Sequence, residues 1–186
     1  MKIMLASDVH GDAECARLML EAFKAEGADK LCLLGDLLYH GPRNDLPSGY
    51  DPKETARLLN GARDGLLCVR GNCDGEVDQM VLDFPILSEL AIVFADGVSM
   101  YLTHGHRHGK QSPPPMPRGS VLICGHTHIP CAEEFDGDRY YINVGSVSIP
   151  KEDNERTYAI YEQGTFRIKT LLGGRIIKEI KIKKEI

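Results

Sequence analysis

Short apolar runs alternate with polar or helical segments through the first half of the chain. The runs at 3–6, 31–34 and 66–69 each have the length of a buried strand and stop at polar or glycine positions. Between the first two, residues 12–26 carry apolar side chains at helical spacing, which predicts a helix with one buried face. A second helix is expected at 51–63. The order is therefore strand, helix, strand, helix, strand, and the strands are expected to be parallel.

Capping residues support both helices. Asp12 can accept hydrogen bonds from the first turn of the first helix, and Gly27 follows it as a stop signal. The segment Asp51-Pro52-Lys53-Glu54 predicts a capping box with proline at the first helical position.

The second half has the pattern of β-hairpins. Runs at 92–95 and 98–103 flank Asp96-Gly97, and the segment around 139–144 follows the second such turn, Asp136-Gly137. Further strands are expected at 121–124, 158–161, 166–171 and 175–182. The whole pattern predicts an α/β protein in which two packed sheets have helices outside them. With 186 residues and no linker, residues 1–186 are expected to form a single domain.

Composition and charge narrow the functional classes. A formal net charge of −5 disfavours a binder of duplex nucleic acid, which usually has a basic face. No stretch reaches the ~18 apolar residues that would span a bilayer, and the N-terminus lacks the pattern of a signal peptide. Cys32, Cys68 and Cys124 lie inside apolar runs and are expected to be reduced core residues. We therefore expect a cytoplasmic protein without membrane contact.

Five polar motifs follow apolar, strand-like runs. They are Asp8-Val9-His10, Gly35-Asp36, Gly71-Asn72-Cys73-Asp74, His104-Gly105-His106 and Gly125-His126-Thr127-His128. Sites in open α/β sheets lie at the carboxyl ends of strands, so these side chains are expected to meet at one edge. In D-x-H and H-x-H, the one-residue gap should place both side chains on the same side of an extended segment. Burying so many histidines and carboxylates together without a cation would be costly, which favours a metal site.

The ligand chemistry indicates two divalent cations. Imidazole, carboxylate and amide donors without a thiolate run suit Mn, Fe, Co, Ni or Zn. Seven ligands are too many for one tetrahedral ion and suit a pair of ions that share a bridging carboxylate and hydroxide. Such a pair supplies a hydroxide at neutral pH that can attack phosphorus, and it offsets charge on phosphoryl oxygens. The predicted ligands are Asp8, His10, Asp36, Asn72, His104, His126 and His128.

These motifs resemble the calcineurin-like metallophosphoesterase superfamily and, within it, the small bacterial YfcE family of phosphodiesterases. The segments SDVHG, LLGDLLYHGPRN, VRGNCDGEVDQM, LTHGH, CGHTHIP and NVGSVSIPK carry the resemblance. It implies a four-layer α/β/β/α sandwich of two mixed sheets flanked by helices. It also implies phosphodiester hydrolysis, often with manganese, on a small phosphoester substrate.

The resemblance also implies how the ligands are divided. One metal site would comprise Asp8, His10, Asp36 and His128, and the other would comprise Asp36, Asn72, His104 and His126, with Asp36 as the bridge. Asp36, Asn72, Cys73 and His104 are the expected catalytic residues. His106 competes with His104 as a ligand, and the family motif favours His104.

Cys73 departs from the wider superfamily, whose motif has a histidine there that is thought to protonate the leaving group. A thiol is a less suitable acid, so we expect a preference for leaving groups that need little protonation. The alternative is a spacer without chemistry. Arg43 and Asn44 lie in a Gly- and Pro-rich loop and are candidates for binding substrate phosphate, although an ordinary surface loop is the competing interpretation.

Two other functions are compatible with the pattern. One is a phosphomonoesterase or nucleotide phosphohydrolase of the same superfamily. The other is a non-catalytic protein-binding scaffold, which would be expected to lose its ligands, whereas all seven positions here hold competent donors. Exposed strand edges are compatible with homo-oligomers.

Overall fold

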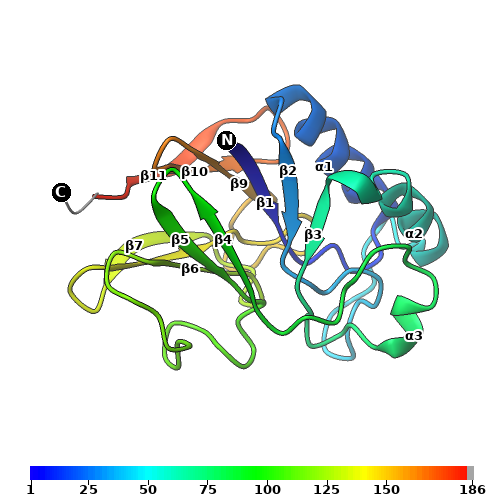
Figure 1. Cartoon of the computed structure of the whole chain (residues 1–186). Coiled ribbons are helices and arrows are strands. Elements are labelled where there is room, and N and C mark those ends of the chain that lie inside the picture. The colour runs from blue at the N-terminus through cyan, green and yellow to red at the C-terminus, as the bar shows by residue number, and fades with distance from the viewer. Residues whose placement is uncertain (184–186) are drawn as a thin grey trace.

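The computed structural model describes residues 1–183, and its elements alternate between helix and strand only in the N-terminal half (Figure 1). The helices are α1 (Ala13–Glu26), α2 (Pro52–Asn60) and α3 (Glu76–Gln79), with a 3-10 turn at Arg63–Gly65. The strands are β1 (Lys2–Ala6), β2 (Lys30–Leu33), β3 (Leu66–Cys68), β4 (Ala91–Ala95), β5 (Val98–Leu102), β6 (Val121–Cys124), β7 (Cys131–Phe135), β8 (Arg139–Asn143), β9 (Thr157–Glu162), β10 (Thr165–Thr170) and β11 (Ile176–Lys181).

The strands form two mixed sheets. The six-stranded sheet has the order β11-β10-β9-β1-β2-β3, and the five-stranded sheet has the order β4-β5-β6-β8-β7. In the first sheet β1, β2 and β3 are parallel, with Met4 opposite Leu31, and the C-terminal strands add antiparallel pairs. In the second sheet β5, β6 and β8 are parallel, with Ile123 opposite Ile142. Both sheets thus combine parallel strands with hairpins; the parallel strands of the first sheet were predicted, whereas those of the second sheet were not.

Local signals explain the two long helices. The Asp12 carboxylate accepts a hydrogen bond from the Cys15 amide at 2.9 Å, and Gly27 ends α1 in the left-handed conformation at φ 60°. The Asp51 carboxylate caps α2 by accepting from the Glu54 amide at 3.0 Å. The second half of the expected capping box is absent, because the Glu54 carboxylate pairs with Arg57.

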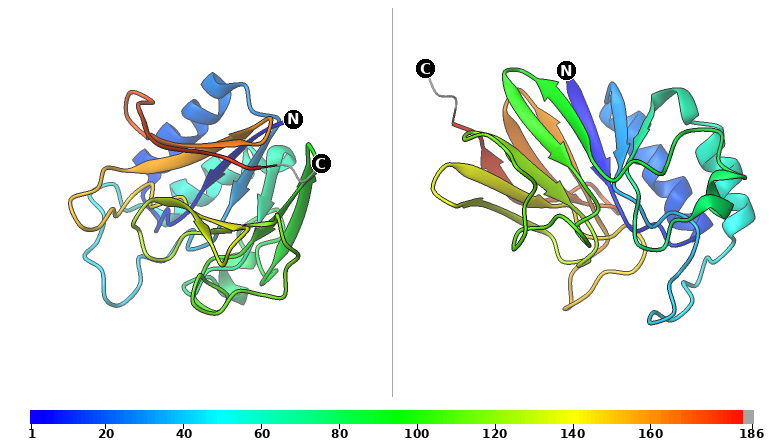
Figure 2. Two further views of the ribbon diagram at one scale, coloured as in Figure 1. Left: turned by 90° about the vertical axis from the view of Figure 1, so that its left-hand side faces the viewer. Right: turned by 60° about the horizontal axis from the view of Figure 1, so that its bottom comes forward.

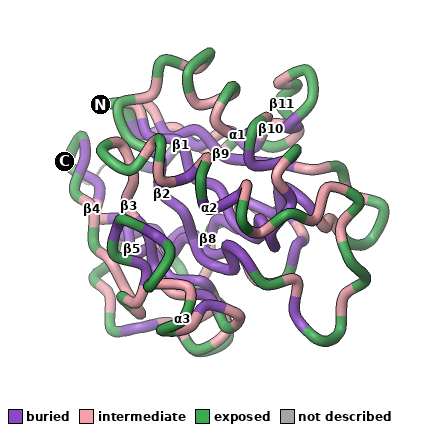
Figure 3. Tube along the Cα trace, turned by 90° about the vertical axis from the view of Figure 1, so that its right-hand side faces the viewer, coloured by how far each residue is buried: buried purple, intermediate pink, exposed green. Residues whose placement is uncertain are grey.

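Alternating side chains of β1 supply two separate cores. Ile3 and Leu5 face the second sheet and pack in a cluster with Met100 and Ile123. Met4 and its alternate neighbours face α1 and α2 and pack in a second cluster. Buried positions lie in the interior, and exposed positions lie on loops and also on outer faces such as that of β11 (Figure 3). This two-sided burial explains why the strand reads as an unbroken apolar run.

The α/β class and the two mixed sheets are confirmed, but the expected fourth layer is not helical. All three helices lie on the six-stranded side, and the strands of the second sheet form the opposite flank (Figure 2). A loop covers the outer face of the second sheet, where Met116 packs against Tyr101, Leu122 and Tyr141. The segment 103–120 has four prolines and forms no helix, because proline cannot donate the hydrogen bond that a helix interior requires.

Cys32, Cys68 and Cys124 are buried and unpaired, as predicted for core residues. None of the helices within residues 1–183 has the length and apolar character that a membrane crossing would need.

Candidate metal centre

The five polar motifs gather at the carboxyl ends of parallel strands from both sheets. Asp8, Asp36 and Asn72 follow β1, β2 and β3, whereas His104 and His126 follow β5 and β6. Parallel strands end at the same edge, and the two sheets pack face to face, so the ends of both sheets meet. Each side chain is therefore positioned by a different strand of a packed core.

The conformation of the motifs differs from the expected extended segment. Asp8, His10, His126 and His128 all have positive φ, between 50° and 65°, and Asp36 has φ 55°. Left-handed backbone at residues other than glycine is uncommon and clusters at functional sites. The hydroxyl groups of Ser146 and Ser148 hold the first of these turns by donating to the Asp8 carbonyl, at 2.9 and 2.7 Å.

Asp8, His10 and His128 form the first cluster. The Nε2 atoms of His10 and His128 lie 3.5 and 3.1 Å from Asp8 Oδ1 and 3.4 Å from each other. All three side chains are at most 3% exposed. The cluster therefore presents one oxygen and two nitrogens toward a common point.

Asp36 lies between this cluster and a second one. Its Oδ2 atom is 3.8 Å from His10 Nε2 and 3.4 Å from His104 Nε2. The Asn72 amide oxygen lies 3.0 Å from the same His104 nitrogen. The His126 ring lies 5.0 Å from the His104 ring, between centroids. His126 and His128 thus face different partners rather than one shared position, in contrast to the expectation for H-x-H.

Backbone carbonyls orient three of the rings. The Nδ1–H groups of His10, His104 and His128 donate to the carbonyls of Tyr39, Leu34 and Ile149, at 2.8, 2.6 and 2.5 Å. In the neutral form of each ring, this arrangement leaves the Nε2 lone pair directed at the carboxylates, which is the tautomer of a metal ligand.

The chemistry of these donors fits a cation. Asp8 Oδ1 is buried and has no hydrogen-bond partner, although three imidazole nitrogens lie within 4.0 Å. His104 Nε2 and the Asn72 oxygen approach to 3.0 Å, so either a proton on His104 or a cation held by both atoms satisfies this contact. Unpaired buried carboxylates are costly, so a cation among these atoms satisfies the electrostatics of the site.

Burial and neighbouring charges shift the pKa values of the clustered side chains. Burial opposes charge on Asp8, but its contacts with His10, His104 and His128 hold its pKa well below the usual value. Burial also opposes charge on His104, but the neighbouring Asp36 and Asp8 outweigh it and raise the pKa of His104 to about 9. Burial and the charge of His104 lower the pKa of His126 to about 4, so this ring is neutral and able to donate a lone pair.

Asp74 fixes the backbone of the turns that carry the ligands. Its carboxylate accepts backbone hydrogen bonds from Asp36 and Leu37 at 2.8 Å and from Gly71 at 2.7 Å. It therefore ties the turn after β2 to the turn after β3. Gly71 has no side chain because a Cβ there would collide with the Asp36 carboxylate and backbone.

A cleft of about 410 Å³ opens over the two clusters. Arg43 and Asn44, the predicted phosphate-binding residues, line it together with Cys73, His126 and His128. The structure adds Lys151, which sequence reasoning did not single out as a site residue because its segment, NVGSVSIPK, was used only as part of the family resemblance. Ser146 and Ser148 were missed for the same reason.

His106 lies outside this arrangement. It lines a different cavity, and its ring is 5.3 Å from that of His104 and 6.1 Å from that of His126. The structure thus brings His104, rather than His106, to the carboxylates.

Comparison with known proteins agrees with this geometry. A model of the calcineurin-like phosphoesterase superfamily domain matches residues 1–165. Phosphodiesterase YfcE of Escherichia coli (strain K12) is 43% identical over 182 residues, which are 98% of this chain and 98% of that protein. The solved structure of YfcE, a phosphoesterase from E. coli, covers 98% of this chain and 100% of its own at 42% identity and a TM-score of 0.95.

A protein of much lower sequence identity has a similar fold. A Vps29 single mutant from Entamoeba histolytica matches with a TM-score of 0.63 at 21% identity, over 98% of this chain and 100% of its own. That similarity concerns the fold alone. The family match over most of the chain and the 43% identical relative lead to a firmer conclusion: the chain belongs to the calcineurin-like phosphoesterase superfamily.

Proposed function

We propose that this protein is a metal-dependent phosphodiesterase that uses two divalent cations. The observation that carries the proposal is the buried, unpartnered Asp8 Oδ1 facing three imidazole nitrogens. The 43% identical relative, which is named a phosphodiesterase and matches along nearly its whole length, supports the same reaction.

One cation would be held by Asp8, His10, Asp36 and His128, and the other by Asp36, Asn72, His104 and His126. The position of Asp36 Oδ2, within 4.0 Å of both His10 and His104, supports its role as the bridging ligand. When bound, such a pair supplies an activated water at neutral pH and offsets the charge on the phosphoryl oxygens. The mixed N and O donors favour manganese, with iron, nickel, cobalt and zinc as alternatives.

The remaining residues of the cleft fit the handling of a phosphodiester. Arg43 can donate two parallel hydrogen bonds to phosphate, and Lys151 adds a second positive charge to the same cleft. Asn44 donates to the His40 carbonyl at 2.8 Å, which fixes the loop that carries Arg43. The backbone N–H of Cys73 donates to Asp36 Oδ1 at 2.8 Å and leaves Oδ2 for the metal positions.

The proposal extends to location and substrate class. Six unpaired cysteines, four of them buried, favour a reducing compartment, and we propose the cytoplasm. The expected absence of duplex nucleic acid and the capacity for homo-oligomers stay predictions. Among related activities, diester hydrolysis is favoured over monoester hydrolysis by the name of the 43% identical relative.

Metal analysis combined with a panel of phosphoesters tests the proposal. We expect two bound cations per chain after loading with Mn²⁺, and faster hydrolysis of bis(p-nitrophenyl) phosphate than of p-nitrophenyl phosphate. Asp36→Asn should lower kcat/KM by about 100-fold or more, because metal stabilisation of charge is worth several kcal/mol.

The matched control is Asp64→Asn, which removes a carboxylate that is 99% exposed. It should change neither the number of bound cations nor kcat/KM. Retained activity and two bound cations in Asp36→Asn would remove the bridging role. A loaded protein that hydrolyses no diester would refute the function itself.

A further inference from the structure

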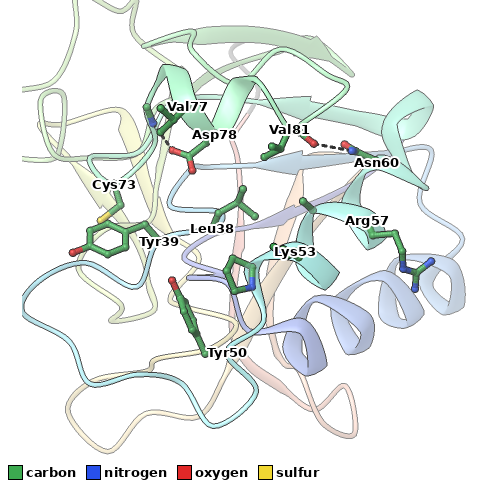
Figure 4. Close-up of a pocket in the computed structure, with 13 residues that line it drawn as sticks. Leu38, Tyr39, Tyr50, Lys53, Arg57, Asn60, Cys73, Val77, Asp78 and Val81 are labelled. Carbon is green, nitrogen blue, oxygen red and sulfur yellow. Dashed lines mark hydrogen bonds between the residues drawn. The ribbon is translucent and has the colours of Figure 1, made fainter.

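A second cavity, of about 790 Å³, adjoins the metal-lined cleft and has a different chemical character (Figure 4). Its apolar part, which we call the apolar groove, is lined by Leu38, Tyr39, Tyr50, Ala56, Val77 and Val81. Cys73 lines both the groove and the cleft, so the two spaces are adjacent at this residue. A volume of this size, with mainly apolar walls, is typical of a small-molecule site.

The aromatic wall of the groove is held in place. The His40 ring lies between Tyr39 and Tyr50, in edge-to-face contact with both, at centroid distances of 4.8 and 5.3 Å. The Tyr50 ring packs so closely on Gly11 that a Cβ there would lie 2.7 Å from it. Edge-to-face contacts of this kind are favourable and fix ring orientation. The groove is therefore preorganised rather than formed by loose side chains.

The same wall is coupled to the metal-binding motif. The Tyr39 carbonyl accepts the hydrogen bond that orients His10, while the Tyr39 side chain lines the groove. Figure 4 shows the Tyr39 ring beside Cys73, at the end of the groove nearest the cleft. A ligand whose phosphate occupies the cleft would therefore place an attached group at the mouth of the groove.

The opposite wall is apolar and open to solvent. Val77 is 72% exposed and Val81 52%, and Tyr39 across the groove is 42% exposed. Lys53 and Arg57 lie along the α2 wall, but the Arg57 guanidinium pairs with Glu54 and points away from the groove (Figure 4). Asp78 also lines the cavity, beside Val77, and its carboxylate accepts a hydrogen bond from the Gly75 amide at 2.7 Å (Figure 4). Most of the other lining side chains are apolar or aromatic, so the groove favours apolar groups.

We propose that the apolar groove binds an aryl or alkyl ester group of the substrate while the substrate phosphate occupies the metal-lined cleft. This inference rests on the proposed phosphodiesterase function and specifies its substrate class: phosphodiesters in which at least one ester group is apolar. The shared wall at Cys73 places the groove next to the cleft, which favours a substrate group over a second protein chain as the occupant.

Calorimetric titration with benzylphosphonate and methylphosphonate tests the groove without turnover. Both ligands carry the same phosphonate charge, and only benzylphosphonate can reach the groove. The Mn²⁺-loaded protein should bind benzylphosphonate about tenfold more tightly, because filling an apolar pocket commonly gives discrimination of that order. The double variant Val77→Asn/Val81→Asn should lose this preference and keep its affinity for methylphosphonate.

The matched control is Ile92→Asn, which changes an apolar side chain that is 44% exposed on β4, outside the groove, and should keep the preference. Equal affinities for the two phosphonates in the parent protein would overturn the proposal. So would a double variant that dissociates an oligomer in sedimentation but keeps the benzyl preference, because the groove would then cover a second copy.

Phosphonate binding tests the groove, and diester hydrolysis separately tests the proposed function on which the groove proposal rests. Hydrolysis of bis(p-nitrophenyl) phosphate without a benzyl preference contradicts only the groove. A benzyl preference without hydrolysis of any diester contradicts only the phosphodiesterase function.

Discussion

Cys73 occupies the position beside the metal clusters from which a leaving group would be protonated in the wider superfamily. Its Sγ accepts a hydrogen bond from the Asn72 amide at 3.2 Å, so it is held within the cleft. Burial, with the nearby charge of Asp36, raises the pKa of the thiol to about 12. A group with this pKa is a poor proton donor at neutral pH. The protein should therefore favour substrates whose leaving group is stable as an anion and needs no proton.

Cys73→His should raise activity on alkyl phosphodiesters relative to aryl ones. A positioned acid commonly contributes 100-fold or more, so an increase of about tenfold in the ratio of kcat/KM values is expected from an imperfectly placed ring. Cys73→Gln provides a control of similar reach without a titratable group, and it should leave the ratio unchanged. If both variants shift the ratio equally, proton donation is not the reason for the preference.

Asp74 acts at the same scale by holding backbone rather than substrate. Asp74→Asn would turn an amide NH₂ toward one of the backbone N–H groups that the carboxylate now accepts. A buried donor without a partner costs about 1–3 kcal/mol, so the melting temperature should fall by roughly 2–10 °C.

The affinity for Mn²⁺ should decrease in parallel in Asp74→Asn, because the turn that carries Asp36 and Leu37 loses one of the hydrogen bonds that fix it. Thermal unfolding and metal titration measure the two effects separately. Stability lost without any change in metal affinity would limit Asp74 to a structural role.

At the scale of elements, Glu26 joins the end of α1 to three strands of the six-stranded sheet. Its carboxylate pairs with Lys2 of β1 at 2.9 Å and with Lys169 of β10, and it accepts from the Tyr158 hydroxyl of β9 at 2.9 Å. Burial opposes its ionisation, but these donors outweigh burial and lower its pKa to about 2. The ionised carboxylate thus stabilises the packing of α1 on the sheet.

Glu26→Gln should lower the free energy of unfolding by about 2 kcal/mol at pH 7. The pKa is lower in the folded chain than the ordinary value of 4.5, so the stabilisation is complete above that value. It is lost as pH falls from 4.5 toward 2, and the difference between variant and parent should shrink over that range. Urea unfolding at several pH values measures this difference in the free energy of unfolding.

Glu21→Gln is the control at this scale, because its pair with Arg17 is exposed and should contribute at most about 0.5 kcal/mol. A Glu26→Gln difference that stays constant down to pH 3 would contradict the assigned ionisation.

At the scale of the whole molecule, the predicted ligands come from both sheets. Asp8, Asp36 and Asn72 follow strands of the six-stranded sheet, whereas His104 and His128 follow strands of the five-stranded one. The two sheets also share one core, in which Leu5 of β1 packs with Ile123 of β6. Bound cations would therefore join the two halves of the fold, and the formation of one domain by the chain stays a prediction.

Removal of metal should consequently lower the stability of the entire fold. A 100-fold excess of cation over its dissociation constant contributes about 2.7 kcal/mol, so chelation should lower the melting temperature by roughly 5–10 °C. Calorimetry with EDTA and with added Mn²⁺ measures the change. In Asp36→Asn the same additions should give a much smaller shift, and an equal shift would show that the cation binds elsewhere.

Particular residues show how much the sequence predicted and why. Asp12, Gly27 and Asp51 mark helix ends through hydrogen bonds within a few residues, so these boundaries were correct. The metal motifs were identified because each combines short spacing with an apolar strand before it. α3 was missed, because its four residues contain no buried side chain and so give no periodic pattern.

The sequence by itself determined the alternation of strands and helices, the two hairpin turns and the residue types of the metal motifs, because these depend on local hydrogen bonding and on one-dimensional periodicity. Only the tertiary structure decided the left-handed turns at Asp8 and His128, the separation of His126 from His128, and the place of Lys151 in the cleft. It also decided that a loop, not a helix, covers the second sheet. These features depend on contacts between segments far apart in the chain, which no local pattern encodes.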